Sequence, residues 1–238
     1  MAKNLLLAST STVHGSAYLG YIQDEMRSFF LKAKNLIFIP YARPSGISLD
    51  DYTAKAAEAF EKIGFSLRGI HQDGDPVSAI EKCDGIFTGG GNTFLLLKTL
   101  QEKGLMDPLR EKVKSGTPYM GTSAGSNIAC KSINTTNDMP IVYPHSFEAL
   151  GLVPFNINPH YLDPDPSSTH MGETRETRIN EFHGVSNIPV AGLREGTALE
   201  IHGDDWKIVG EDSVRVFLPG KSAQEISEAK ELKTVLIG

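Results

Sequence analysis

The chain has 238 residues, of which 40% are apolar and 22% charged, a composition within the range of ordinary globular proteins. This length suits one well-buried domain and is short for two, so we expect a single domain over residues 1–238. The formal net charge is −6, from 29 acidic and 23 basic residues. Because nucleic-acid binders carry a basic patch or stripe, which is not seen here, the charge pattern argues against a nucleic-acid partner.

The two cysteines and the lengths of the apolar runs bear on the cellular compartment of the protein. Cys83 and Cys130 are too few for a disulfide framework in a chain of this size, which favours a reducing environment. The apolar run at residues 5–8 is too short for the core of a signal peptide, and no stretch approaches the roughly 18 apolar residues of a membrane span. We therefore expect a cytoplasmic protein with no membrane partner.

The first half of the chain alternates between short apolar runs and segments with helical spacing. The runs predict strands at residues 5–8, 36–40, 65–70, 85–88 and 118–121. The segments between them predict helices at residues 20–32, 50–63 and 93–103, the second with Asp50 as N-cap and Gly64 as C-cap. This alternation is typical of the α/β class, a mostly parallel sheet with helices on both faces. Ligand sites in such folds lie at the carboxyl ends of the strands.

After about residue 130 this pattern changes. Residues 134–166 are rich in Pro and Asn, and we interpret them as long functional loops. A helix is predicted at residues 173–182. Short strands follow at residues 190–193, 198–202, 206–209 and 214–217. We expect these extra C-terminal strands to complete the sheet, some of them as antiparallel hairpins.

A serine motif follows the strand predicted at residues 118–121. Gly121-Thr122-Ser123-Ala124-Gly125 precedes a short helix predicted at residues 126–131, which is the context that the Gly-x-Ser-x-Gly nucleophile elbow requires. Its glycines permit a tight turn that exposes the Ser123 hydroxyl at the helix N-terminus, where backbone N–H groups favour a developing oxyanion. The motif predicts a serine hydrolase with Ser123 as nucleophile. The alternative is a Gly/Ser turn that only packs the helix against the sheet.

Three consecutive glycines, residues 89–91, end the preceding strand and open the next helix. Glycine lets the backbone approach a ligand closely and direct N–H groups at an anion. A phosphate loop is disfavoured, because no Gly-Lys-Ser/Thr follows. We therefore expect an oxyanion hole formed by Gly90, Gly91 and Ala124, and the alternative is a helix-entry turn without a ligand.

A serine nucleophile needs a base within hydrogen-bond reach, normally histidine. Of the seven histidines, His145, His160 and His170 all lie in similar loop-like stretches. Spacing alone does not choose between these three.

Five blocks in the chain carry a resemblance to a known family. They are Gly-Gly-Gly-Asn at 89–92, Gly-Thr-Ser-Ala-Gly-Ser-Asn at 121–127, Thr-Asn-Asp-Met-Pro-Ile at 136–141, Asn-Pro-His-Tyr at 158–161 and Gly-Glu-Thr-Arg-Glu-Thr-Arg at 172–178. In order and spacing, over nearly the whole chain, they resemble the peptidase E family of α-aspartyl dipeptidases. The resemblance implies a serine peptidase that removes an N-terminal Asp from dipeptides, on a sheet related to that of class I glutamine amidotransferases. It also implies Ser123 as nucleophile and His160 as base.

The family pattern offers two acids that could orient the histidine, Asp138 and Glu195. Glu195 falls at the end of the strand predicted at residues 190–193, and we favour it as the partner of His160. We keep Asp138 as a further functional residue that faces the substrate amine. The alternative for each is a solvated loop carboxylate.

An N-terminal Asp presents a side-chain carboxylate, which arginine binds bidentately. Arg175 and Arg178 lie three positions apart, on one face of the helix predicted at residues 173–182, and we expect them to bind the substrate. Arg175 is favoured because it is closer to the start of the helix. The alternative is a charged surface helix whose arginines pair with neighbouring glutamates.

Two other functions stay open at this point. One is a cyanophycinase-like hydrolase of an aspartyl-containing polymer, and the other is an amidotransferase-like binding module without catalysis. The chain has no His-x-x-x-His or Cys-x-x-Cys spacing, so we expect no metal and no cofactor. The expected partner is a small peptide substrate, and a homodimer is left open.

Overall fold

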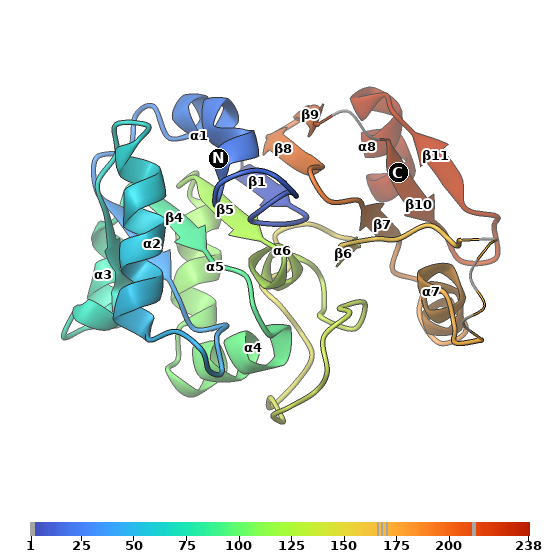
Figure 1. Cartoon of the computed structure of the whole chain (residues 1–238), viewed down its shortest axis with the longest axis horizontal. Coiled ribbons are helices and arrows are strands. Elements are labelled where there is room, and N and C mark those ends of the chain that lie inside the picture. Colours follow the sequence, from blue (N-terminus) through green and yellow to red (C-terminus); the bar gives the residue numbers. More distant parts are fainter. Residues whose placement is uncertain (1–2, 166, 168, 170, 211–212) are drawn as a thin grey trace.

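The computed structural model describes residues 3–165, 167, 169, 171–210 and 213–238, and its main feature is a seven-stranded sheet (Figure 1). The strand order is β3-β2-β4-β5-β1-β8-β9, in which the first five strands run parallel, β8 pairs antiparallel with β1, and β9 pairs antiparallel with β8. The bounds are β1 (Asn4–Ala8), β2 (Leu36–Ile39), β3 (Leu67–Gly69), β4 (Gly85–Thr88), β5 (Tyr119–Thr122), β8 (Ala198–His202) and β9 (Asp205–Val209). The predicted parallel sheet is confirmed.

Helices cover both faces of this sheet, as predicted for the α/β class. On one face lie η1 (Gly20–Ile22), α1 (Gln23–Phe29) and α2 (Leu49–Glu61). On the other lie α3 (Pro76–Lys82), α4 (Thr93–Glu102), α5 (Met106–Lys114) and α6 (Ala124–Ala129), with η2 (Ile70–Gln72) at their edge. Alternate residues of β1 divide between the two cores, Leu5 and Leu7 in one and Leu6 in the other, as the two-residue repeat of a strand requires.

Three predicted helix boundaries are wrong, the two ends of α2 and the start of α6. Helix α2 is capped by Ser48, whose hydroxyl accepts a hydrogen bond from the N–H of Asp51 at 3.0 Å, and Asp50 stands inside the first turn. Gly64 lies two residues beyond the C-cap Lys62, in the left-handed conformation with φ 89°. Helix α6 begins directly after Ser123, two residues earlier than predicted.

A second sheet of four strands lies on the side of the molecule away from α2 and α3 (Figure 1). Its order is β11-β10-β7-β6, with bounds β6 (Asn156–Pro159), β7 (Val190–Leu193), β10 (Val214–Phe217) and β11 (Gln224–Ile226). Helices α7 (Arg175–His183) and α8 (Ala229–Ile237) accompany it. The expectation that the C-terminal strands complete the first sheet therefore holds for β8 and β9 and is wrong for β7 and β10.

The edge strand β6 of the second sheet lies inside the segment interpreted as loops, so that interpretation is wrong at residues 156–159. Its residues, Asn-Ile-Asn-Pro, alternate polar and apolar, and all four are buried. The Asn156 amide bonds to Ser132, and the Asn158 amide donates to the Thr135 carbonyl and to Asn137. Hydrogen bonding of this kind lowers the cost of burying polar side chains. β6 pairs in parallel with β7.

The sheet register brings the functional segments together. Ala8 pairs with Thr122 and Thr88 with Gly121, so the segments after β1, β4 and β5 leave the same edge of the first sheet. Pro159 pairs with Leu193, which brings together the residues after β6 and β7.

Among the described residues, no helix is long and apolar enough to cross a membrane.

Gly125 offers a test of the packing between α6 and β4. A Cβ at this position would lie 2.2 Å from the Thr88 carbonyl oxygen, a backbone atom that cannot move independently. We expect Gly125→Ala to cost about 1–3 kcal/mol by overpacking, and at about 2–4 °C per kcal/mol to lower Tm by roughly 2–12 °C. Gly74→Ala is the matched control, because a Cβ there meets nothing within 4 Å. Equal Tm values for both variants in thermal denaturation would contradict this packing.

Candidate active site

Ser123 stands between β5 and α6 with φ 52° and ψ −109°, a backbone conformation that non-glycine residues rarely adopt. Its N–H donates to the Ala8 carbonyl at 3.0 Å, and its carbonyl accepts from the N–H groups of Ser126 and Asn127. Gly121 leaves no room for a side chain, since a Cβ there would lie 2.5 Å from the Gly125 backbone. The turn therefore has the geometry of a nucleophile elbow, with the serine hydroxyl at the start of a helix.

His160 lies directly after β6 and contacts Ser123. Its Nε2 is 2.9 Å from Ser123 Oγ, and its Nδ1 is 2.9 Å from Glu195 Oε1. With the proton on Nδ1 donated to the carboxylate, Nε2 is free to accept the serine proton. Three side chains from three different segments thus form one hydrogen-bonded chain.

The other two histidine candidates stand apart from this chain. His145 donates its backbone N–H to Gln101 Oε1, and its side chain has no hydrogen bond to Ser123 within the described part of the protein. His170 lies outside the described residues.

The backbone of His160 is held by a residue that the sequence analysis does not identify. Ser9, which directly follows β1 and is fully buried, accepts the His160 N–H at 2.8 Å and donates to the Leu193 carbonyl at 2.8 Å. One hydroxyl therefore ties the first sheet to both strands that precede His160 and Glu195. The sequence feature that could have identified Ser9 is its position at the carboxyl end of a parallel strand, where functional residues gather.

The two candidate acids occupy different environments. Glu195 contacts His160, as described above. The Asp138 carboxylate accepts three hydrogen bonds. Thr93 donates its N–H at 2.7 Å and its hydroxyl at 2.6 Å, and Thr136 donates its hydroxyl at 3.0 Å. Thr93 is the first residue of α4, where a carboxylate is favoured by the helix dipole. Asp138 thus fixes the end of the glycine loop, and its carboxylate has no hydrogen bond to His160 among the described residues.

The glycine loop lies beside Ser123. A Cβ at Gly90 would be 3.2 Å from the Cβ of Ser123, and Gly91 adopts φ 144° against the Ala42 carbonyl. The Tyr52 hydroxyl donates to the Gly90 carbonyl at 3.1 Å, which orients that peptide. In the described structure, the N–H groups of Gly90, Gly91 and Ala124 have no hydrogen-bond acceptor. Such N–H groups next to a nucleophile can stabilise an oxyanion.

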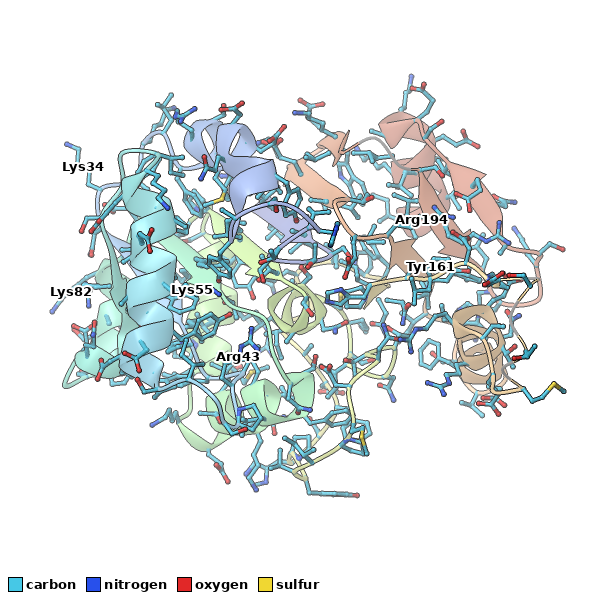
Figure 2. All side chains as sticks on the ribbon, viewed as in Figure 1. Lys34, Arg43, Lys55, Lys82, Tyr161 and Arg194 are labelled. Atoms are coloured by element: carbon cyan, nitrogen blue, oxygen red, sulfur yellow. The ribbon has the colours of Figure 1, made fainter. Side chains whose placement is uncertain are left out.

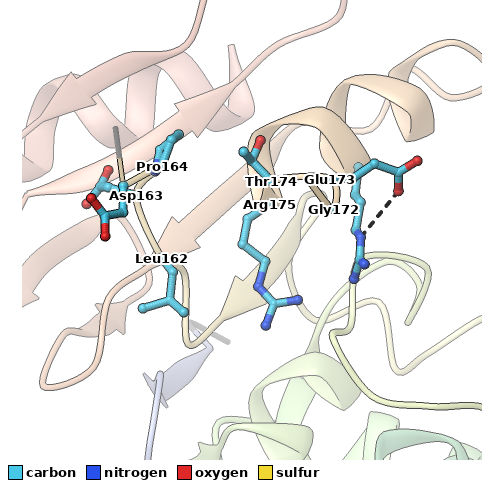
Figure 3. Close-up of a pocket in the computed structure, with 9 residues that line it drawn as sticks. Leu162, Asp163, Pro164, Gly172, Glu173, Thr174 and Arg175 are labelled. Carbon is cyan, nitrogen blue, oxygen red and sulfur yellow. Dashed lines mark ion pairs between the residues drawn. The ribbon is translucent and has the colours of Figure 1, made fainter. Parts of the chain in front are cut away.

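The two candidate arginines border a cavity of about 500 Å³ formed by residues 162–165 and 172–178 (Figure 3). Arg178 is exposed and pairs with Glu173, its Nε 3.6 Å from Oε2. Arg175 is half-buried, with no ion pair among the described residues, and Figure 3 shows its side chain extending away from α7. Burial and the neighbouring Arg178 lower the pKa of Arg175, which reflects a cation without a protein counter-ion.

The cavity adjoins the segment that follows His160. Its lining includes Leu162, two residues after His160, but neither Ser123 nor His160. The lining has both signs of charge, with Asp163, Asp165 and Glu173 beside the two arginines, and the Asp163 carboxylate is bound by Arg194. Among the residues that the structure describes, no group of three or more His, Cys, Asp or Glu could hold a metal ion.

Comparison with known proteins identifies the family. A family model described as peptidase family S51 matches residues 5–209. A "Peptidase E" of Streptomyces coelicolor is 48% identical over 98% of this chain and 95% of its own. A "Probable alpha-aspartyl dipeptidase" of Drosophila melanogaster is 45% identical over 99% and 98%.

Among solved structures, a peptidase from an acI-B1 actinobacterium matches 95% of each chain with a TM-score of 0.70 at 19% identity, which supports the fold alone. The family match and the two relatives agree with the resemblance carried by the five sequence blocks. The elbow, its adjoining histidine and these matches lead to one conclusion: the chain belongs to peptidase family S51.

Proposed function

We propose that this peptidase hydrolyses dipeptides with an N-terminal aspartate through an acyl-enzyme on Ser123. The observation that carries the proposal is the continuous hydrogen-bonded chain from Ser123 Oγ through His160 to Glu195, with 2.9 Å at each step. The aspartyl preference is supported by the relative described as an alpha-aspartyl dipeptidase and by the guanidinium of Arg175, which has no ion pair among the described residues.

The first half of the reaction forms the acyl-enzyme. Ser123 Oγ attacks the scissile carbonyl carbon while its proton passes to His160 Nε2, and Glu195 stabilises the resulting imidazolium. The negative charge on the former carbonyl oxygen is met by the N–H groups of Gly90, Gly91 and Ala124. When the C–N bond breaks, His160 returns the proton to the leaving amine.

The second half releases aspartate. A water molecule gives a proton to His160 and attacks the acyl carbon, and the bond to Ser123 Oγ then breaks as the serine is reprotonated. No metal is needed in this sequence of steps, because the base and the oxyanion donors supply the proton transfer and the charge stabilisation.

We infer that Arg175 binds the side-chain carboxylate of the substrate, and that Asp165, which lines the same cavity, faces its α-ammonium group. A cavity with both signs of charge complements an aspartyl residue with a free amino group. Arg178 is a weaker candidate, because Glu173 already neutralises it.

We also infer a reducing compartment, the cytoplasm, with residues 1–238 acting as one domain. Cys83 and Cys130 are free and buried, and burial raises the pKa of Cys83 to about 11, so neither thiol is poised for oxidation. One apolar core contains residues from both sheets, among them Leu7 and Ala191, which supports a single domain.

Removing the nucleophile or its base is the first test. We expect Ser123→Ala and His160→Ala each to lower kcat on an Asp-X dipeptide by on the order of 10⁴-fold, because the two residues act as one unit. Thermal denaturation provides the folding control. A correctly folded variant with activity within tenfold of the parent would refute the assignment.

The two acids are distinguished by isosteric substitution. Glu195→Gln should mainly lower kcat and leave Tm nearly unchanged, because it alters only the exposed contact with His160. Asp138→Asn should lower Tm, since it removes a charge from the start of α4, at a cost of about 1 kcal/mol. Steady-state kinetics and calorimetry on both variants check this division. The reverse pattern would make Asp138 the acid that orients His160.

Substrate selectivity tests the role of Arg175. The parent should cleave Asp-X about 100-fold faster than Asn-X, which lacks the charge, and than Glu-X, whose longer side chain displaces the scissile bond by about 1 Å. Arg175→Met should remove most of this preference. Arg178→Met is the matched control and should keep it. If kcat/KM ratios for the three substrates stay unchanged in Arg175→Met, another residue binds the carboxylate.

A further inference from the structure

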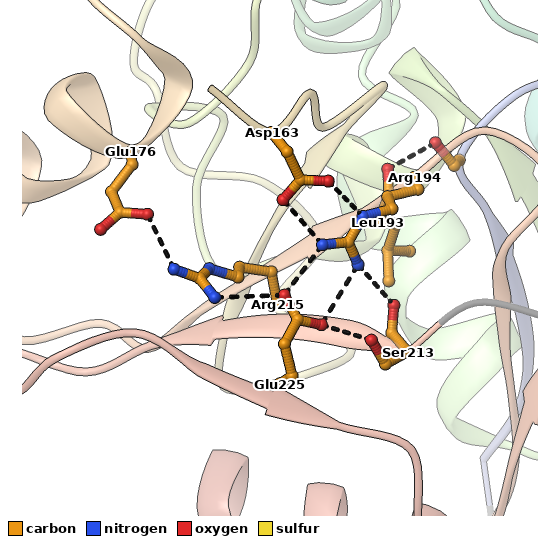
Figure 4. A network of polar contacts seen from close by, with 8 residues as sticks. Asp163, Glu176, Leu193, Arg194, Ser213, Arg215 and Glu225 are labelled. Carbon is orange, nitrogen blue, oxygen red and sulfur yellow. Dashed lines mark hydrogen bonds and ion pairs between the residues drawn. The ribbon is translucent and has the colours of Figure 1, made fainter. Parts of the chain in front are cut away.

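Figure 4 shows a network of charged side chains around Arg194. It contains two arginines and three acids: Arg194, Arg215, Asp163, Glu176 and Glu225. Arg194 binds Asp163 through two hydrogen bonds, Nε to Oδ2 at 2.7 Å and Nη2 to Oδ1 at 2.8 Å. It also donates to Glu225 at 2.8 and 3.2 Å and to the Ser213 carbonyl at 3.1 Å.

The pair of Arg194 and Asp163 joins the two segments that carry the base and the acid. Arg194 directly precedes Glu195, and Asp163 lies three residues after His160. Backbone pairing between these segments ends at the hydrogen bond from the Tyr161 N–H to the Leu193 carbonyl, at 2.9 Å. Beyond that point, the ion pair of Arg194 with Asp163 joins the two segments in the described structure, in addition to the contact of His160 with Glu195.

Glu195 itself has little to hold it. Its side chain is 50% exposed, and within the described residues the single hydrogen-bond partner of its carboxylate is His160. It lies in a tight turn closed by the hydrogen bond from the Thr197 N–H to the Arg194 carbonyl at 3.1 Å, with Gly196 at φ 86°. The position of Arg194, the first residue of this turn, therefore sets where the Glu195 side chain starts.

Arg194 has the geometry to fix that position. Its side chain is 20% exposed, lies over the Tyr161 ring at 5.7 Å, and donates to two carboxylates and a carbonyl (Figures 2 and 4). The hydrogen bonds that it donates to Asp163 and Glu225 raise its pKa, and those to Asp163 lower the pKa of that carboxyl. A guanidinium held by this many partners keeps a single orientation.

We propose that Arg194 is a positioning residue for the reaction: by binding Asp163 and Glu225 it fixes the turn that holds Glu195 against His160. This inference rests on the proposed function, because it assumes that His160 and Glu195 activate Ser123. Arg194 touches neither substrate nor reacting atoms in this account. Its effect reaches the reaction through the distance between the carboxylate and the imidazole.

Arg215 offers a matched comparison within the same network. It also pairs with two carboxylates, Glu176 at 3.1 Å and Glu225 at 3.3 Å. Its backbone lies in β10, and its ion pairs connect that strand to α7 and β11 and do not reach the turn at residues 194–197. Loss of Arg215 therefore removes two ion pairs of the network without releasing Glu195.

The experiment measures how fast Ser123 reacts with a small, uncharged fluorophosphonate, together with kcat and KM on an Asp-X dipeptide. The reagent needs an activated serine but no aspartyl subsite. For Arg194→Met we expect labelling and kcat to fall about 10- to 100-fold, with KM within about threefold, because a shift of about 1 Å in the triad costs on that order. Arg194→Lys, which keeps the charge but not the fork of donors, should be intermediate. Arg215→Met should be labelled within about twofold of the parent.

Arg194→Met labelled at the parent rate would overturn the proposal, and so would equal slowing in Arg215→Met. If Arg194→Met does not fold, Asp163→Asn is measured in its place against the same limits. Failure of the proposed function is distinguishable, because the parent itself would then not be labelled at Ser123.

Discussion

The left-handed backbone of Ser123 is the constraint around which the site is arranged. A residue with φ 52° is held in that conformation only if its neighbours leave no alternative. Here the two glycines of the elbow permit contacts that any side chain would prevent, and the Ser123 N–H is already bound to the Ala8 carbonyl. The hydroxyl therefore points away from the sheet edge at a fixed angle, and other segments of the chain must supply its hydrogen-bond partners.

Those partners come from the second sheet. The parallel pairing of β6 with β7 sets His160 and Glu195 side by side, and Ser9 connects that pair to the strand next to Ser123. A triad divided between two sheets depends on how the sheets are joined. The buried hydroxyl of Ser9 makes that joint, while the ion pairs of Arg194 hold together the segments after β6 and β7 within the second sheet.

The electrostatics around the site separate structural charges from a charge available to a ligand. Arg194 and Arg215 are each bound to two carboxylates, and Arg178 has Glu173. Arg175, in the same region, has no such partner within the described structure, and both its burial and a like charge act against it. A substrate carboxylate would relieve this imbalance, which is how a peptidase with a net charge of −6 can attract an acidic substrate.

The local features of this protein follow from its sequence alone. The strand–helix alternation, the elbow at residues 121–125 and the family resemblance depend on short segments, in which neighbouring residues dictate the backbone. The choice of base among three histidines and the separate contacts of Glu195 and Asp138 depend on residues 35 to 45 positions apart. The buried amides of β6 are a similar case, because their partners Ser132, Thr135 and Asn137 stand 21 to 24 positions away along the chain. Hydrogen bonds between distant segments leave no periodic signal in a sequence, so only the tertiary structure decides them.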